Sequence, residues 1–130
     1  MTFNETNKNC NLCPKLRNFL LEKRIEFPKY HNSPVPSFGD KSPELLIIGL
    51  APGLHGANKT GRPFTGDWAG DLLFSALEKY GFTKGTYKGT SDDGLELNGV
   101  RITNAVRCVP PQNKPISTEA NACREFLKKE

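Results

Sequence analysis

The sequence of 130 residues contains no apolar run long enough to cross a lipid bilayer. Its longest apolar run, at residues 45–51, has only the length of a β-strand. The first ten residues, MTFNETNKNC, contain no apolar signal region, so we expect a protein of the cytoplasm or a comparable reducing compartment, with no membrane attachment. No linker or internal repeat divides the sequence, and its length leaves no room for a second full core. We therefore expect a single domain over residues 1–130.

The sequence also lacks a strong excess of positive or negative charge. There are 18 lysine and arginine residues against 14 acidic ones, and the net charge of +4 permits contact with a phosphate backbone without demonstrating it. A hydrophobic fraction of 36% with 25% charged residues is ordinary for a globular protein. Composition alone therefore leaves the function open.

Two segments have the composition of buried strands. The run ELLIIGL, at residues 44–50, is continuously apolar and precedes turn residues, which is the pattern of a central strand buried on both faces of a parallel sheet. Residues 100–106 are rich in β-branched side chains and follow an Asp-Asp-Gly turn, so they predict a second buried strand that ends near Asn104. We expect a site loop after each strand.

Helical spacing of apolar residues predicts three helices. The first covers residues 10–27, with Pro14 in its first turn and its apolar side packed on the sheet. The second has Asp67 as N-cap and ends at Gly81, and its apolar stripe consists of Trp68, Leu72, Leu73, Ala76, Leu77 and Tyr80. The third begins at Ser117 or Thr118. Together with the strands, these helices predict an α/β fold with a parallel sheet.

Two strands and three helices do not complete a doubly wound sheet, because its inner strands need neighbours on both edges. We therefore expect the domain to be incomplete at its C-terminal end. The alternative is a small domain whose open edge is covered by the proline-rich segment at residues 31–43.

The segment at residues 49–70, GLAPGLHGANKTGRPFTGDWAG, contains six glycines and two prolines where the first strand ends. Glycine allows close backbone approach and positive φ, so this density predicts the wall of a ligand site. A plain surface loop is the alternative, although Ala51-Pro52 and Pro63-Phe64 are unusual for one. A Rossmann-like nucleotide or phosphate site is a further hypothesis, but neither the G-x-G-x-x-G nor the P-loop spacing is present.

The sequence has only four cysteines, two of them close together and two far along the chain. Cys10 and Cys13 form a C-x-x-C motif, whereas Cys108 and Cys123 lie far along the chain. In a reducing compartment this arrangement favours a metal or cluster over disulfides. The spacing is not that of a zinc ribbon, so a 4Fe-4S cluster, zinc and unliganded buried thiols all stay open at this point.

The segments GLAPGLHGANKTGRPFTGD and ITNAVRCVPPQNKP, taken with the cysteines, resemble the uracil-DNA glycosylase superfamily and most closely its type-5, iron-sulfur branch. The resemblance runs from Cys10 to Cys123. It implies a three-layer α/β/α sandwich with a four-stranded parallel sheet and a structural 4Fe-4S cluster bound by Cys10, Cys13, Cys108 and Cys123. It also implies a hydrolase of base excision repair that removes uracil and related deaminated bases from DNA, and we expect this enzyme to be a monomer.

The sequence departs from the family pattern at two places. Leu50 stands where the type-4 branch has a carboxylate, a feature that type-5 members share. A histidine-containing motif of the family has no counterpart after Cys123, and neither His31 nor His55 is a sequence substitute for it. A second hypothesis is therefore a truncated, inactive fragment that keeps the cluster and binds DNA.

Glycosidic cleavage produces a cationic sugar and an anionic base, and the base must first leave the helix stack. We assign Asp67 to stabilising the sugar cation and orienting water, with plain N-capping as its alternative role. Phe64 is predicted to stack on the base, and Asn104 to bond the uracil edge. Core packing and a turn role, respectively, are the alternatives for these two residues.

The remaining candidates lie in the same two loops. Ala51, Pro52 and Gly53 are expected to form the floor beneath the base and sugar. Asn58 is a further catalytic candidate near the cleaved bond, although a turn role is the alternative. Basic residues that flank the loops are candidates for phosphate contacts, namely Lys59, Arg62, Arg107 and Lys114.

Overall fold

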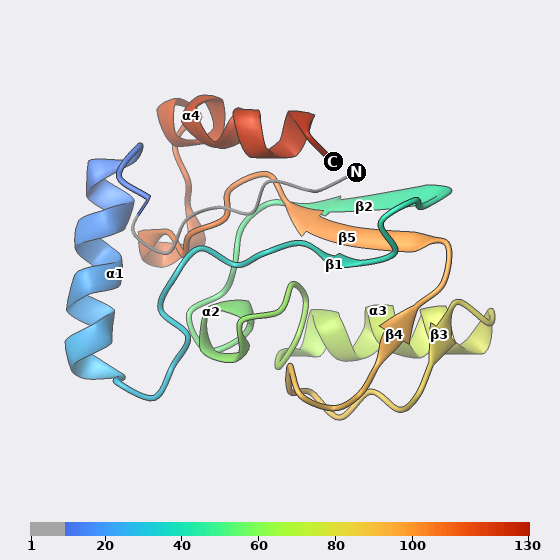
Figure 1. Cartoon of the computed structure of the whole chain (residues 1–130). Coiled ribbons are helices and arrows are strands. Elements are labelled where there is room, and N and C mark those ends of the chain that lie inside the picture. The colour runs from blue at the N-terminus through green and yellow to red at the C-terminus, as the bar shows by residue number, and fades with distance from the viewer. Residues whose placement is uncertain (1–9) are drawn as a thin grey trace.

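The computed structural model describes residues 10–130 of the chain. Residues 1–9, on which the expected absence of a signal region depends, lie outside the described residues. None of the helices in the described part has the length and apolar character that a membrane span requires. Figure 1 shows a small sheet with α3 (Trp68–Lys79) against one face and α4 (Ser117–Lys128) against the other. This layered arrangement confirms the predicted α/β class.

The main sheet of the described residues contains three strands in the order β1-β5-β2. Strand β2 (Leu45–Gly49) runs parallel to β5 (Val100–Asn104), with Ile47 opposite Ile102. Strand β1 (Phe38–Gly39) pairs antiparallel with the other edge of β5. The predicted parallel pair is therefore confirmed, and the proline-rich segment supplies the antiparallel edge strand.

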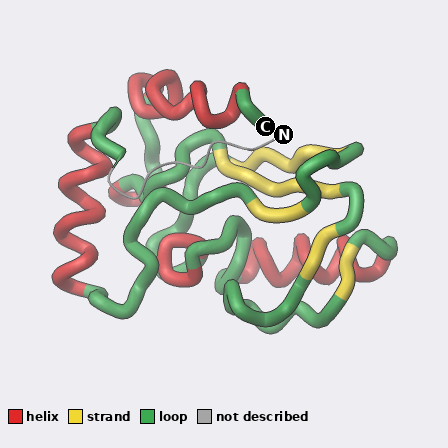
Figure 2. The backbone as a smooth tube through the Cα atoms, in the orientation of Figure 1, coloured by secondary structure: helices red, strands yellow, loops and turns green. Residues whose placement is uncertain are grey.

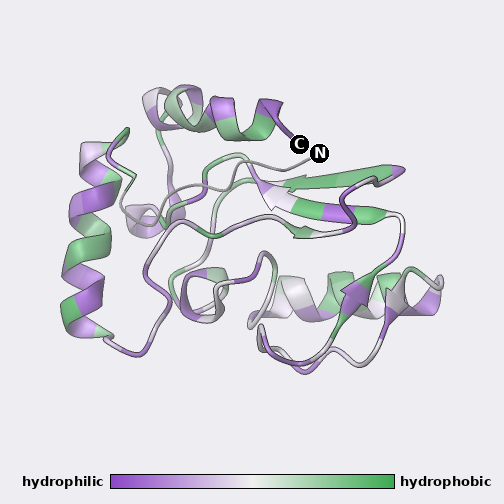
Figure 3. Ribbon diagram, viewed as in Figure 1, coloured by the Kyte–Doolittle hydropathy of each residue, from purple (hydrophilic) through white to green (hydrophobic). Residues whose placement is uncertain are grey.

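The prediction that β2 is the central strand, buried on both faces, is wrong. All five residues of β5 are buried, and β5 is the middle strand. Strand β2 lies at an edge, where Leu45 is 46% and Ile48 is 51% exposed. Figure 3 shows that β2 is nonetheless hydrophobic along its length. An apolar run indicates a strand, but which strand occupies the centre depends on long-range pairing that the run does not encode.

Helix α1 (Pro14–Glu26) begins with a proline in its first turn, as predicted, and buries Leu16 and Leu20. It stands beyond one end of the sheet rather than over a face, contrary to the expectation (Figure 1). The loops that leave β2 and β5 run toward this helix (Figure 2). They contain α2 (Ala57–Thr60) and the short 3-10 helix η1 (Pro111–Asn113).

Helix α3 begins after Asp67, as predicted, but its buried face is not the expected stripe. Gly70, Phe74 and Leu77 are its buried residues, whereas Trp68 is 78% and Leu72 59% exposed. The buried face packs on β5 and on the antiparallel pair β3 (Thr83–Lys84) and β4 (Glu96–Leu97), so that the core cluster contains Phe74, Leu77, Leu95, Leu97, Val100 and Ile102.

A buried ion pair fixes the β3–β4 segment against the glycine-rich loop. Arg62 donates two hydrogen bonds to Asp93, at 2.7 and 2.9 Å, and its guanidinium lies 4.7 Å from the Phe38 ring centroid and 5.5 Å from that of Phe74. The hydrogen bonds from Arg62 hold the pKa of Asp93 well below its usual range. Bidentate pairing of this kind fixes orientation as well as charge.

Candidate functional site

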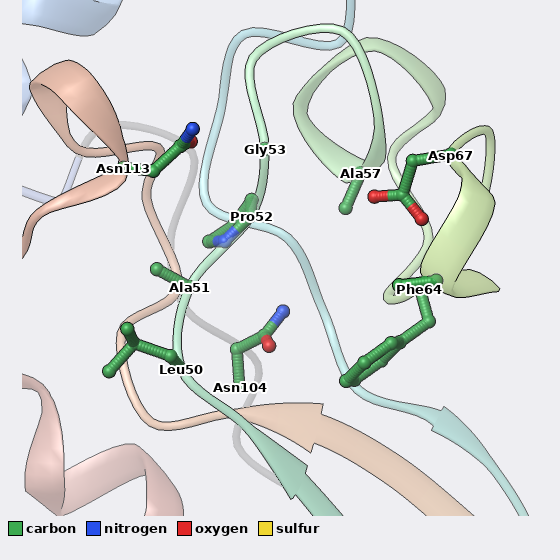
Figure 4. A pocket seen from close by; sticks show the side chains of 10 residues that line it. Leu50, Ala51, Pro52, Gly53, Ala57, Phe64, Asp67, Asn104 and Asn113 are labelled. Carbon is green, nitrogen blue, oxygen red and sulfur yellow. The ribbon is translucent and has the colours of Figure 1, made fainter. Parts of the chain in front are cut away.

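A cavity of about 300 Å³ opens where β2 and β5 end. Its volume falls at the lower end of the range for small-molecule sites. Figure 4 shows the side chains around it, most of which come from the glycine-rich segment. The lining consists of Leu50, Ala51, Pro52, Gly53, Ala57, Phe64, Asp67, Ala69, Asn104 and Asn113. The structure thus brings together six of the residues predicted for the site, namely Ala51, Pro52, Gly53, Phe64, Asp67 and Asn104.

Gly49, the last residue of β2, lets two walls of this cavity converge. A Cβ atom at this position would lie 2.6 Å from the Phe64 ring and also inside van der Waals distance of the Asn104 side-chain oxygen. Without a side chain at Gly49, the ring and the amide both reach the floor of the cavity. The glycine therefore creates space at a place where any other residue would push Phe64 or Asn104 aside.

The two oxygens of Asp67 have separate surroundings. Oδ1 accepts a hydrogen bond of 2.8 Å from the backbone N–H of Gly70, which caps α3. Oδ2 lies toward the loop, 3.9 Å from where a Cβ of Gly53 would be, and the carboxylate points into the cavity (Figure 4). N-capping and a role in the cavity are therefore compatible, because each uses a different oxygen.

Phe64 is held in a left-handed backbone conformation, with φ of 54°. Such a conformation is strained for a bulky residue and persists only where its surroundings enforce it. The Phe64 carbonyl lies so close to Gly70 that a Cβ there would overlap it. The ring is half-buried and packs against the core while it also lines the cavity. Core packing and a place in the cavity lining coincide in this residue.

Asn104, the last residue of β5, is only 4% exposed. Its backbone carbonyl accepts a 3.1 Å hydrogen bond from Nε of Arg107. Its side-chain amide has no hydrogen-bond partner among residues 10–130 and faces the cavity (Figure 4). A buried amide without a protein partner is a group that a ligand can satisfy.

Sequence reasoning missed Asn113, which lines the cavity from the loop after β5. This residue follows Gln112, and both have positive φ of 57°. The only signal in the sequence is its place in PPQNKP, a loop predicted to belong to the site, in which only Lys114 was chosen, as a phosphate contact. Leu50 also lines the cavity, and it offers no polar group there.

The structure does not support a catalytic role for Asn58, because this side chain is fully buried behind the cavity and is not part of its lining. Nδ2 of Asn58 donates a 2.9 Å hydrogen bond to Oδ1 of Asn32. Asn32 in turn bonds the carbonyls of Lys23 and Phe27 at the end of α1. Asn58 therefore joins the glycine-rich loop to α1.

Two of the four predicted phosphate contacts are buried inside the protein. Arg62 is 4% and Arg107 1% exposed. Arg62 binds Asp93, and Arg107 binds Ser37, Glu130 and the Asn104 carbonyl. Lys59 and Lys114 are exposed and stay available for this role.

A second, narrow cavity is lined by all four cysteines. Cys10 and Cys13 precede and begin α1, Cys108 follows β5, and Cys123 lies in α4. Leu12, Leu16, Arg17 and Phe126 complete the lining. The backbone N–H of Arg107 donates to Sγ of Cys123 at 3.4 Å. Residues separated by up to 113 positions in the sequence thus meet at one place.

Burial, with a smaller contribution from the neighbouring cysteines, raises the pKa of the Cys13 thiol to about 11 and that of Cys108 to about 12. Closely spaced thiols become thiolates readily only when a cation neutralises them. Among residues 10–130 no group of three or more such side chains is placed to hold a single metal ion. Four thiols that line one cavity are a donor set of the kind that binds zinc or an iron-sulfur cluster.

A family model described as the uracil DNA glycosylase superfamily matches residues 36–130. The chain belongs to this superfamily. The match covers β1 to α4, including every residue that lines the larger cavity and two of the four cysteines. The resemblance stated from the sequence motifs is thereby confirmed.

Three curated relatives named type-5 uracil-DNA glycosylase are similar over most of the chain. The protein from Mycobacterium tuberculosis is 45% identical over 127 residues, which are 93% of this chain and 47% of the relative. The relative from Thermus thermophilus is 43% identical, with 98% of this chain and 60% of the relative covered. The relative from Pyrobaculum aerophilum is 40% identical, with 94% of this chain and 56% of the relative covered. The chain therefore spans about half the length of the curated relatives it matches.

Proposed function

We propose that this glycosylase-family chain carries the base-binding side of a uracil-DNA glycosylase, which hydrolyses the N-glycosidic bond of uracil and related deaminated bases in DNA. The observation that supports this most strongly is the convergence of Phe64, Asp67 and Asn104 on one cavity at the ends of β2 and β5. The cavity provides an aromatic face, a carboxylate and an unpartnered amide. A flipped pyrimidine nucleotide needs these three kinds of contact.

Asp67 is assigned to the sugar. As the bond between C1′ and the base nitrogen breaks, its electron pair leaves with the base and positive charge develops on the sugar. The Oδ2 atom, which faces the cavity, stabilises this charge and orients the water that attacks C1′. The products are the free base and an abasic sugar. Because position 50 is a leucine, Asp67 is the one carboxylate in the described cavity lining.

Phe64 and Asn104 are assigned to the base. The Phe64 ring provides a stacking surface, which stabilises an unstacked base by about 1–3 kcal/mol in comparable sites. The Asn104 amide offers one donor and one acceptor, which complement a carbonyl and the N–H of uracil. Ala51, Pro52 and Gly53 form the floor on which base and sugar lie. Asn113 is a further polar group at the rim.

Cys10, Cys13, Cys108 and Cys123 are proposed to hold a 4Fe-4S cluster. Bound there, the cluster would cross-link the start of α1, the loop after β5 and α4, a structural contribution. A reducing compartment such as the cytoplasm suits four free cysteines. We propose a monomer that acts on uracil-containing DNA without membrane attachment.

The test of this function is release of free uracil from a single-stranded oligonucleotide with one internal uracil. The chain is purified without oxygen, and an otherwise identical oligonucleotide with thymine is the control. We expect uracil and an alkali-labile abasic site from the first substrate only. Binding of the uracil oligonucleotide without any release by the intact, iron-containing chain would overturn the proposal in favour of an inactive, DNA-binding fragment.

A further inference from the structure

His55 is exposed and belongs to the loop that borders the larger cavity. It lies between Gly53 and Ala57, both of which line that cavity. The next residue, Gly56, is in contact range of the Asp67 carboxylate, since a Cβ there would lie 2.6 Å from Oδ2. The imidazole is therefore carried by the same short loop that borders the proposed sugar-binding carboxylate.

The His55 ring is held in one orientation by aromatic neighbours. Nδ1 is hydrogen-bonded to the Tyr30 hydroxyl at 2.9 Å. The ring stands edge-on to Phe27 and Tyr30, with centroid separations of 5.4 and 5.7 Å and interplanar angles of 89° and 88°. Phe27 and Tyr30 are stacked on each other at 4.7 Å. An exposed side chain that is fixed in this way loses little further entropy when it binds a ligand.

The second nitrogen of His55 has no partner in the described part of the chain. When the Tyr30 hydroxyl donates to Nδ1, the proton of the neutral ring resides on Nε2. Protonation of the ring also leaves a proton on Nε2. In these two states the ring presents a free N–H donor. In the other neutral tautomer Nδ1 donates to the Tyr30 hydroxyl and Nε2 is an acceptor, so a phosphate oxygen selects the forms in which Nε2 carries a proton.

Lys59 adds positive charge at the same place. Its ammonium group lies over the Tyr30 ring, 5.5 Å from the centroid. No carboxylate within residues 10–130 lies within ion-pair distance of it. An exposed ammonium and an oriented N–H donor around one tyrosine ring are the elements of a site for a singly charged oxyanion.

We propose that His55 and Lys59, oriented by Tyr30, bind a backbone phosphodiester next to the extruded nucleotide. This inference rests on the proposed function, because it takes the nucleotide in the cavity to be part of a DNA strand. The strand leaves the cavity over the loop at residues 53–57, where His55 donates a hydrogen bond to a nonbridging oxygen and Lys59 neutralises its charge. The site contacts no base and is therefore independent of sequence.

The experiment measures binding of single-stranded oligonucleotides with one internal 2′-fluorinated deoxyuridine, whose glycosidic bond resists cleavage. In a matched series, each phosphate flanking the uridine is replaced in turn by an uncharged methylphosphonate. For the unmodified chain, we expect one replacement to weaken binding about tenfold, because it removes the charge that His55 and Lys59 would bind. In a His55→Ala/Lys59→Ala variant, the same replacement should change affinity less than twofold.

Salt dependence and a third variant give independent readouts. Loss of one phosphate contact should reduce the slope of log affinity against log salt by about 0.7 for a single strand. Tyr30→Phe keeps the ring and removes the hydroxyl, so the methylphosphonate penalty should fall to an intermediate value. Lys84→Ala, an exposed lysine in β3, is the matched control and should keep the full penalty and slope.

Equal methylphosphonate penalties in the unmodified chain and the double variant would overturn the inference, as would an unchanged salt slope. Melting temperatures of the variants show whether the exposed substitutions leave the fold intact. The proposed function is judged separately by uracil release from the cleavable oligonucleotide. The phosphate site can therefore fail while uracil release persists, and the reverse outcome is equally visible.

Discussion

The two cavities of this protein differ in size, in construction and in what they can bind. The base cavity has a volume of about 300 Å³ and is formed mostly by one continuous segment between Leu50 and Ala69. The cysteine cavity holds about 10 Å³ and is formed by residues from three separate parts of the chain. The first suits a ligand that enters and leaves. In the proposed function the second holds a group that joins distant segments, so the proposal assigns recognition and stabilisation to different sites.

The largest expected effect concerns recognition alone. Asp67→Asn should lower the rate of uracil release about 10²- to 10³-fold, because the charge facing the sugar is lost. The melting temperature should change little, since asparagine caps helices about as well as aspartate. Steady-state measurement of uracil release tests the rate, and thermal melting tests the stability. Asp92→Asn, an exposed carboxylate outside the cavity, is the control. A variant that retains full activity would remove Asp67 from the mechanism.

The second expected effect concerns stabilisation. Cys108→Ser should abolish stoichiometric iron binding and cost about 3 kcal/mol of unfolding free energy, which lowers the melting temperature by about 10 °C or more. Iron and sulfide analysis together with thermal melting provide the measurement. Full iron content in the variant, or zinc in place of iron in the unsubstituted chain, would contradict the division between the two cavities.

A third substitution tests how the stacking ring is positioned. Gly70→Ala normally stabilises a helix by about 1 kcal/mol. Here the new Cβ would overlap the Phe64 carbonyl, so we expect a loss of about 1–3 kcal/mol and weaker uracil binding. Ser75→Ala, on the exposed side of the same helix, should be neutral or slightly stabilising. A stabilised Gly70→Ala variant would show that the loop conformation is not fixed by this contact.

The smallest effect on uracil release is expected for Asn58. Because this side chain joins two segments behind the cavity, Asn58→Ala should leave the turnover rate within about twofold while it destabilises the fold by about 1–3 kcal/mol. Release kinetics measured well below the melting temperature separate the two effects. A hundredfold loss of turnover at unchanged stability would restore Asn58 to the reacting centre.

The sequence predicted those parts of the molecule that depend on neighbouring residues. The glycine-rich segment, the cap at Asp67 and the end of β5 at Asn104 are local features, and the structure places them as expected. The features that the structure places differently from expectation depend on pairing across the chain. An apolar run does not reveal that β2 lies at an edge, and Asn58 was selected for its place in the motif although its partner, Asn32, lies 26 residues away.

The cysteines also show that sequence spacing alone does not determine which residues meet in the fold. Their spacing left cluster, zinc and free thiols open, and only the fold brings Cys10 and Cys123 into one cavity. Arg62 and Arg107 were predicted to contact phosphates because they flank the two loops. Both are buried and form ion pairs instead. Arg62 pairs with Asp93, which is 31 residues away in sequence, and Arg107 pairs with Glu130, which is 23 residues away.

The most direct test of the central claim is a crystal structure of the protein with an oligonucleotide that carries a 2′-fluorinated deoxyuridine. The proposed function predicts the uracil ring in the cavity, stacked on Phe64 and hydrogen-bonded to the Asn104 amide, with the Asp67 carboxylate beside C1′ of the sugar. A base that is bound elsewhere, or in the cavity without contacts to Asn104 and Asp67, would contradict it.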